Sequence, residues 1–379
     1  MRLLCIALPA LLLPLCGLAS AADWHLSPAF SLNAEYTDNP WLSFQGVEAV
    51  RGAYLEASLP LIAKAESAEF QAIADGRVFH YNDRLFDHDD YKLDLSLKDK
   101  GERGAFAASG DATYDTTLTS ELGTTGLTDI NRRHSHYDAA FNQKLQLAED
   151  SLAILDLRGE TDHYEDVAMT GLVDYRYGVA VAAYQHQWTQ ITAVGIGFQA
   201  GRLWVPGRPD LATTLEAARF AVTHNFTERF SLEAYGGPAQ AQQRAVKTYR
   251  SATGQLTLRY GGERTDFSLQ VGRQFEPTGY GSVTAQKSAA LGLSHRLSEK
   301  LSSVTTLSYL DSSYVLGVPG GGAFDVNDWR FDQGLAWKWS ETIAISLAIS
   351  EVRQFVSAMP GHAQRFTANF GVRWTPQVF

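Results

Sequence analysis

The chain alternates apolar and polar side chains with a period of two along most of its length. Near the C-terminus, in FTANFGVRW (residues 366–374), every second residue is apolar, and the residues between are Thr, Asn, Gly and Arg. A period of two is typical of a β-strand, whose successive side chains point to opposite faces. About eighteen segments of roughly 8 to 12 residues follow this period. The clearest are 24–36, 91–97, 175–183, 192–204, 267–275, 329–339, 343–349 and 366–374, with 212–222 and 301–309 less regular.

The connections between these segments alternate between two kinds. One kind is short and charged, as at 99–103, 148–150, 227–229, 262–264, 298–300 and 340–342. The other kind is longer and richer in Gly, Pro, Thr and Asn, as at 115–134, 205–211, 236–247, 312–326 and 356–363. Short turns at one end and long loops at the other are typical of a transmembrane β-barrel.

Aromatic residues gather at both ends of the predicted strands. The loop ends carry Tyr36, Tyr81, Tyr91, Tyr114, Tyr137, Tyr164, Tyr175, Trp204, Phe275, Trp329 and Phe355. The turn ends carry Trp24, Trp188, Phe230, Tyr260, Trp337, Trp339 and Trp374. Two such belts are expected where a barrel crosses the two lipid–water interfaces.

Together these patterns predict an all-β fold, a transmembrane antiparallel β-barrel of about 18 strands with short periplasmic turns and longer extracellular loops. An even number of strands places both termini in the periplasm. The alternative, a soluble β-sandwich, needs separate explanations for the aromatic belts and for the two kinds of connection. In the barrel, lipid covers the apolar side of each strand and a wet interior faces the polar side.

The first 21 residues resemble a secretory signal peptide. Arg2 precedes an apolar run that ends in small residues before residue 22. We therefore expect a signal peptide at 1–21 and a single barrel domain at 22–379. Both cysteines lie inside the leader, so the exported chain has no disulfide. Its formal charge is 31 basic minus 42 acidic residues, or −11, which disfavours nucleic-acid binding.

The last residue, Phe379, resembles the terminal aromatic that the outer-membrane assembly machinery reads in Gram-negative barrels. It is one residue out of phase with the alternation of residues 370–374, and Pro376 intervenes. A bulge that resets the register or a free tail both fit this pattern.

The alternation also predicts which charged side chains line the interior. The acids lie mostly in the first half of the chain and the bases dominate the second half, so opposing walls are expected to set a field across the pore. The alternative is that these charges pair and only solvate the wall. The predicted pore-lining residues are Asp75, Arg77, Asp94, Asp111, Asp138, Asp156, Arg158, Arg176, Arg219, Arg259, Arg330, Asp332, Arg365 and Arg373.

No catalytic, cofactor or metal site is predicted, and the protein is not expected to be an enzyme. The loop 87–90 is most simply a solvated acidic loop that can attract divalent cations. His134 and His136 lack Cys or further His partners in the sequence. Arg132 and Arg133 beside them are most simply solvated loop residues, and contact with lipopolysaccharide phosphate or an anionic sugar is the alternative. The loop 115–134 either folds inward to narrow the pore or lies outside it.

The stretch AEYTDNPWLS (34–43) at the end of the first strand resembles the Y-x-DN motif of the EpsL-like β-barrel porins, which are associated with exopolysaccharide gene clusters. The resemblance rests on Tyr36, Asp38 and Asn39, together with the chain length and the leader. Asp38-Asn39-Pro40 is also a turn-forming sequence.

The resemblance implies an outer-membrane conduit for a secreted polysaccharide, with inward aromatic residues such as Phe79, Tyr81, Tyr184 and Tyr235 stacking on sugars. A general diffusion porin for small polar solutes, or a non-conducting structural or adhesin barrel, would carry the same sequence pattern. The partners expected are outer-membrane lipids and lipopolysaccharide, the assembly machinery, and the polysaccharide with its periplasmic export components. The expected location is the Gram-negative outer membrane.

Overall fold

The computed structural model describes residues 22–45, 48–117, 132–165, 171–243, 247–315, 325–357 and 359–376. Apart from two short 3₁₀ turns, η1 (Arg84–Phe86) and η3 (Pro209–Leu211), its regular elements are strands. They are β1 (Asp23–Leu26), β2 (Ala29–Thr37), β3 (Val50–Lys64), β4 (Ala68–Tyr81), β5 (His88–Gly101), β6 (Gly104–Thr116), β7 (Arg133–Ala148), β8 (Ser151–Tyr164), β9 (Tyr175–Thr189), β10 (Thr192–Trp204), β11 (Thr213–Thr227), β12 (Phe230–Gln243), β13 (Lys247–Gly261), β14 (Thr265–Pro277), β15 (Val283–Arg296), β16 (Leu301–Tyr314), β17 (Val326–Lys338), β18 (Ile343–Val356) and β19 (Ala363–Trp374).

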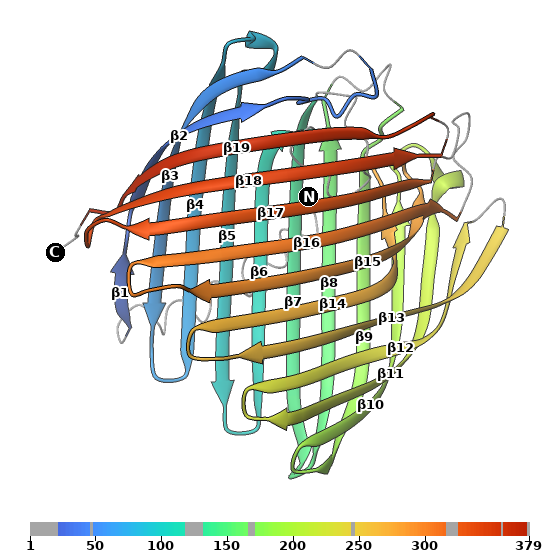
Figure 1. Ribbon diagram of the computed structural model, residues 1–379. Coiled ribbons are helices and arrows are strands. Elements are labelled where there is room, and N and C mark those ends of the chain that lie inside the picture. The colour runs from blue at the N-terminus through green and yellow to red at the C-terminus, as the bar shows by residue number, and fades with distance from the viewer. Residues whose placement is uncertain are drawn as a thin grey trace.

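The strands form a closed antiparallel barrel with 18 positions. Each strand from β3 onward pairs with the next, and β19 pairs with β2 to close the ring. The segments β1 and β2 follow one another along β3 and occupy a single position. The strand expected at 24–36 is thus interrupted at Ser27-Pro28, where proline has no N–H for the ladder. In Figure 1 the later strands run across the front wall, and the earlier strands cross behind them.

The two kinds of connection lie at opposite ends of the barrel, as the sequence predicts. We call these the turn end and the loop end. Turns such as Glu102-Arg103 and Glu149-Asp150 join neighbouring strands at the turn end. The expected loop at 236–247 is wrong in its extent, because β12 continues to Gln243. Its Gly-Gly-Pro sequence reads as a turn, but Gly236, Gly237 and Pro238 lie opposite residues of β13 within the sheet.

The outer face of the barrel is an unbroken apolar surface in the region where the ring closes. Trp337, Ile345, Val372, Leu32, Leu55 and Val78 are successive cross-strand neighbours on six strands. Leu32 keeps 58% and Leu55 62% of its surface exposed, with no protein layer over either. Such a belt is stable only in contact with hydrocarbon, so the fold is a transmembrane barrel.

Aromatic pairs mark both edges of this outer face. Phe30 stacks on Trp374 at the turn end, with ring centroids 5.8 Å apart, and Tyr309 meets Trp329 near the loop end at 4.7 Å. Four residues expected in the loop-end belt lie elsewhere. The register puts Tyr81, Tyr164 and Tyr175 on the inner face. Phe275 packs against Tyr249 inside the barrel.

Among the described residues, no helix is long and apolar enough to cross a membrane.

The barrel closes where β2 meets β19, and residues after β2 reinforce this closure. The Asp38 amide donates to the carbonyl of Phe366 at 3.1 Å, and the Asp38 carboxylate accepts the Phe366 amide at 2.7 Å. The Asn39 side chain donates to the carbonyls of Ser43 and Gln364, each at 2.9 Å. The Asp-Asn pair that carries the family resemblance therefore extends the pairing of the first and last strands.

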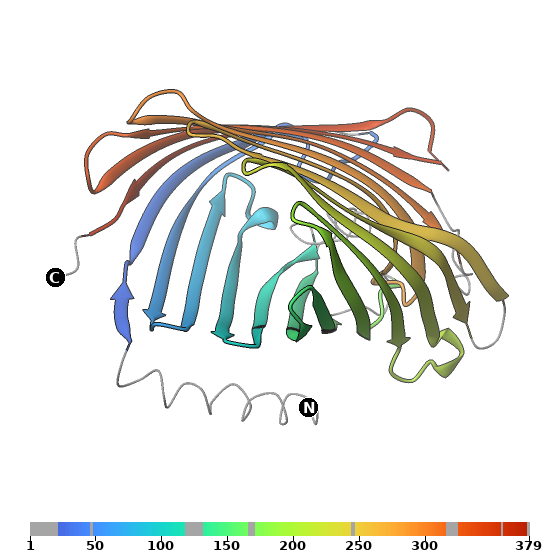
Figure 2. The ribbon, with the colours of Figure 1, turned by 90° about the horizontal axis from the view of Figure 1, so that it is seen from below.

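The loop end of the β14–β15 hairpin leaves the wall and folds into the barrel. The pairing of β13 with β14 stops at Gly254 and Arg273, although both strands continue beyond it. The hairpin tip, residues 278–282, then crosses the interior to the segment before β9, where the Val173 amide donates to the Gly279 carbonyl at 2.7 Å. In Figure 2 the orange β14–β15 hairpin bends from the wall toward the interior. We call residues 273–284 the inturned hairpin.

Placing a charge on the outer face should destabilise the barrel in lipid. We expect Leu55→Arg to lower the free energy of unfolding by about 2–4 kcal/mol, since arginine facing hydrocarbon costs that much near the middle of a bilayer. Ser58→Arg is the matched control, because Ser58 is on the same strand but faces the interior beside Asp75. Denaturant unfolding in lipid vesicles measures the difference. Equal losses in the two variants would contradict the assignment of the two faces.

Candidate functional site: the barrel interior

The inner face can be identified from contacts that cross the barrel. One pocket, with a volume of about 140 Å³, is lined both by β8–β11 residues such as Arg158 and Arg219 and by Glu276 of the inturned hairpin. The face that carries Arg158 is therefore the interior. Following the cross-strand register from Arg158 assigns the inner face of every other strand.

Thirteen of the fourteen predicted pore-lining residues lie on this inner face. In register terms they are Asp75, Arg77, Asp94, Asp111, Asp138, Asp156, Arg158, Arg219, Arg259, Arg330, Asp332, Arg365 and Arg373. Arg176 is the exception. It lies opposite Thr161 and Trp204 on the outer face, because Tyr177 is the residue that shares a row with Glu160. Whether the thirteen line a conducting path stays a prediction.

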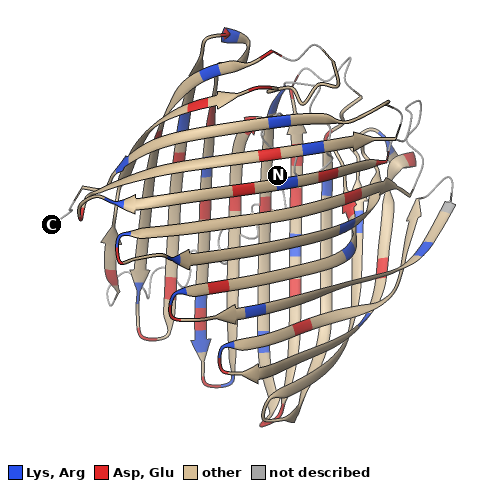
Figure 3. Cartoon of the chain, viewed as in Figure 1, with Lys and Arg blue, Asp and Glu red and all other residues tan. Residues whose placement is uncertain are grey.

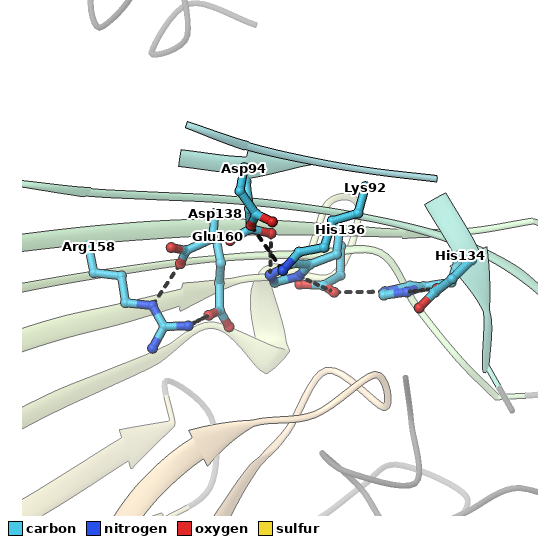
Figure 4. A network of polar contacts seen from close by, with 10 residues as sticks. Lys92, Asp94, His134, His136, Asp138, Arg158 and Glu160 are labelled. Atoms are coloured by element: carbon cyan, nitrogen blue, oxygen red, sulfur yellow. Dashed lines mark hydrogen bonds and ion pairs between the residues drawn. The ribbon is translucent and has the colours of Figure 1, made fainter. Parts of the chain in front are cut away.

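One wall of the interior, formed by β5–β8, is strongly acidic. Asp94, Asp111, Asp138 and Glu160 are consecutive neighbours across four strands. Arg158 reaches two of them, with its Nε 2.7 Å from Asp138 and its Nη2 3.3 Å from Glu160. Figure 4 shows Arg158 beside Asp138 and Glu160, and Asp94 beside Lys92.

The inner face of the opposing wall, in β11–β19, carries both basic and acidic residues, with the basic ones in slight excess. Arg259 pairs with Glu233 at 2.7 Å and Arg330 with Asp332 at 2.8 Å. Arg365 is half-buried, and its Nε has no hydrogen-bond partner among the described residues. Figure 3 shows acidic and basic residues spread along both walls. Many charges thus pair, as the alternative interpretation holds, but the difference between the two walls is still present.

Much of the inner face is wet. The Arg259 side chain keeps 57% of its surface exposed, Arg330 50% and Lys92 48%. A buried arginine or lysine must replace its lost hydration with ion pairs and hydrogen bonds. These three side chains are exposed enough to remain hydrated. The interior therefore holds water along most of its charged walls.

The inturned hairpin packs an apolar cluster into the loop end of the interior. Its members include Tyr164, Leu172, Leu203 and Val283, each no more than 4% exposed. Gly281 has a φ of +68°, and a Cβ there would lie 2.7 Å from Val173. This narrow part of the barrel was not anticipated, because TGYGS at 278–282 reads as an ordinary Gly turn. The loop at 115–134, expected either to fold inward or to lie outside the pore, is mostly outside the described residues.

The acidic loop at 87–90 has structural partners. The Asp87 carboxylate accepts the Tyr81 amide at 2.7 Å and lies 3.0 Å from the His80 Nδ1. The hydrogen bond from the Tyr81 amide, and to a smaller extent the contact with His80, lowers the pKa of Asp87. The Asp87 carboxylate therefore stays ionised, and keeps these contacts, to more acidic pH than an ordinary carboxylate would. Asp89 pairs with Arg133, which is therefore not free for an outside phosphate.

The aromatic residues expected to face sugars divide between the two faces. Phe79 is on the inner face, where its ring packs against Tyr54 and His88 at centroid distances of 4.7 and 4.2 Å. Tyr81 donates its hydroxyl to Glu35 at 2.8 Å. Tyr235 lies under Arg219, 4.5 Å from the ring centroid. Tyr184 is wrongly placed by the sequence pattern, because its register neighbours Ala153 and Ile196 are on the outer face.

Adding a methyl group at Gly281 should loosen the inturned hairpin. We expect Gly281→Ala to speed hydrogen exchange at the Val173 amide at least tenfold, since the residue must adopt positive φ, at a cost of about 1–2 kcal/mol, and also clashes with Val173. Gly361→Ala is the control, with a φ of +88° but nothing within 4 Å of its added Cβ. If Val173 exchanged equally slowly in both variants, the hairpin would not depend on this contact.

No protein-family model matches the chain, and no curated protein matches it either. Solved structures with a similar course include OpdQ of Pseudomonas aeruginosa, at 12% identity and a TM-score of 0.45, with 93% of this chain and 99% of that chain covered. OccK7 (OpdD) of the same organism has 10% identity and a TM-score of 0.47, over 94% of this chain and 100% of that chain. A third, the copper transporter OprC, has 10% identity and a TM-score of 0.44, over 94% and 80%. Function therefore has to be inferred from this chain's own residues.

Proposed function

We propose that the protein is an outer-membrane channel through which small polar and charged solutes diffuse. The observation that carries the proposal is a closed barrel with an apolar outer face and a wet, charged inner face. Lipid-exposed backbone must be fully paired, and closure of the ring achieves this while leaving water inside. The long loops would face the outside and both termini the periplasm. Lipids, lipopolysaccharide and the assembly machinery remain its proposed partners.

Small solutes suit this interior better than a polymer does. The inturned hairpin and its apolar cluster fill part of the loop end. Acidic residues on β5–β8 face basic residues such as Arg259 and Arg330 across the lumen, so the transverse field would orient dipolar solutes. The resemblance to the EpsL-like porins supports polysaccharide export as a second candidate. However, Asp38 and Asn39 act in closing the barrel, so they say little about cargo.

Polymer exclusion should separate these two candidates. We expect single channels in planar bilayers to conduct, and polyethylene glycols above about 1 kDa to leave the conductance unchanged because they cannot pass the hairpin. Entry of polymers several times larger would favour the polysaccharide conduit. Absence of any conductance would favour a structural or adhesin barrel.

Reversing the charge of the basic wall should change ion selectivity. We expect the double variant Arg365→Glu, Arg373→Glu to shift the reversal potential toward cations in a salt gradient, because both positions are on the inner face. Arg176→Glu is the control, since Arg176 is on the outer face near the loop end. An unchanged reversal potential in the double variant would remove these arginines from the permeation path.

A further inference from the structure

Two histidines and one aspartate converge on the inner face near the loop end. His134 and His136 are two residues apart on β7 and so point the same way. Asp162 of β8 lies directly opposite His136 in the register. One ligand atom from each of the three residues lies within 4.8 Å of the others. The group could not be recognised from the sequence, because Asp162 is 26 residues away from His136.

The separations between these atoms are close to those around a bound metal ion. The His134 Nε2 is 2.8 Å from the Asp162 Oδ1, and the His136 Nδ1 is 2.9 Å from the same oxygen. Ligands of a tetrahedral zinc ion, with bonds of about 2.0–2.1 Å, lie about 3.3 Å apart. The two nitrogen–oxygen distances would each have to grow by about half an ångström to admit the ion. Small rotations of the side chains are enough for this.

Each histidine also has a carboxylate near its other ring nitrogen. The Asp115 Oδ1 is 3.0 Å from the His134 Nδ1, and the Asp111 Oδ2 is 4.0 Å from the His136 Nε2. Metal-binding histidines usually donate their second N–H to such a carboxylate, which fixes the tautomer and the ring orientation. A structural ion-pair network would not require a carboxylate on the far side of both rings.

The Asp162 carboxylate also has unused capacity. Its side chain is only 4% exposed, and its Oδ2 has no hydrogen-bond partner among the residues that the structure describes. A buried, unsatisfied carboxylate oxygen is unfavourable, and a cation in the group would satisfy it.

We propose that His134, His136 and Asp162 bind a divalent transition-metal ion of the zinc type on the inner wall. Two imidazole nitrogens and one carboxylate oxygen suit zinc, whereas magnesium and calcium prefer ligand sets made of oxygen alone. His136 and Asp111 keep 26% and 27% of their side chains exposed, so the ion has a way in from the lumen and a coordination position open to water. The proposal departs from the sequence-based expectation of no metal site.

The site can be tested by zinc titration of the full-length protein, refolded in detergent and freed of metal with EDTA. Isothermal titration calorimetry should show one zinc ion per chain with micromolar or tighter affinity, unaffected by a large excess of magnesium. His136→Gln and Asp162→Asn should each weaken binding by more than tenfold. Asp115→Asn should weaken it by about 10–100-fold through the loss of support behind His134.

His163→Gln is the matched control for nonspecific binding. His163 neighbours Asp162 on β8 but belongs to the opposite face, where its Nδ1 lies 2.7 Å from Asp174. This variant should bind zinc like the wild type, and circular dichroism establishes that each variant has folded. Failure of the wild type to bind, or wild-type affinity in the folded His136→Gln variant, would show that the group is only a hydrogen-bonded network. Because binding is measured without a membrane, the result does not depend on whether the barrel conducts.

Discussion

The structure depends on the pairing of the first and last strands. In hydrocarbon there is no water to hydrogen-bond an exposed strand edge, so an open sheet of this size would leave a row of backbone groups unsatisfied. The pairing of β2 with β19 removes that edge, and Asp38 and Asn39 extend it past the end of the regular ladder. With the ring closed, each strand that stays in the wall has one face toward lipid and the other toward the interior.

That division determines where chemistry is possible. Charged groups are tolerated at the inner face because water reaches them, and their arrangement follows from which strands stand side by side. Asp94, Asp111, Asp138 and Glu160 come from four different strands, yet the register sets them in one row. Like charges this close repel, so Arg158 and other cations between them are needed to hold the wall together.

The inturned hairpin is where the barrel departs from a regular cylinder. Its residues give up pairing with β13 and gain burial against β8–β11, where Leu203 and Val283 lose all contact with solvent. Burying large apolar side chains contributes about 1.5–3 kcal/mol each, which can offset the lost ladder bonds. The proposed zinc group lies on the same side of the interior, where His134 stacks on Tyr164 of the apolar cluster at 4.8 Å. Shape and charge at this end of the barrel are therefore linked.

The sequence alone predicts most strand positions, the two kinds of connection and the face to which most side chains belong. These follow from the two-residue period, which is local and needs only the neighbouring residues to be read. It failed at Arg176 and Tyr184, because the apolar side of β9, with Tyr177 and Val179, faces the inturned hairpin and not lipid. Two features became evident only in the folded barrel: residues 278–282 cross the interior, and Asp162 meets His134 and His136. Contacts of this kind join residues from different strands, and no local period in the chain encodes them.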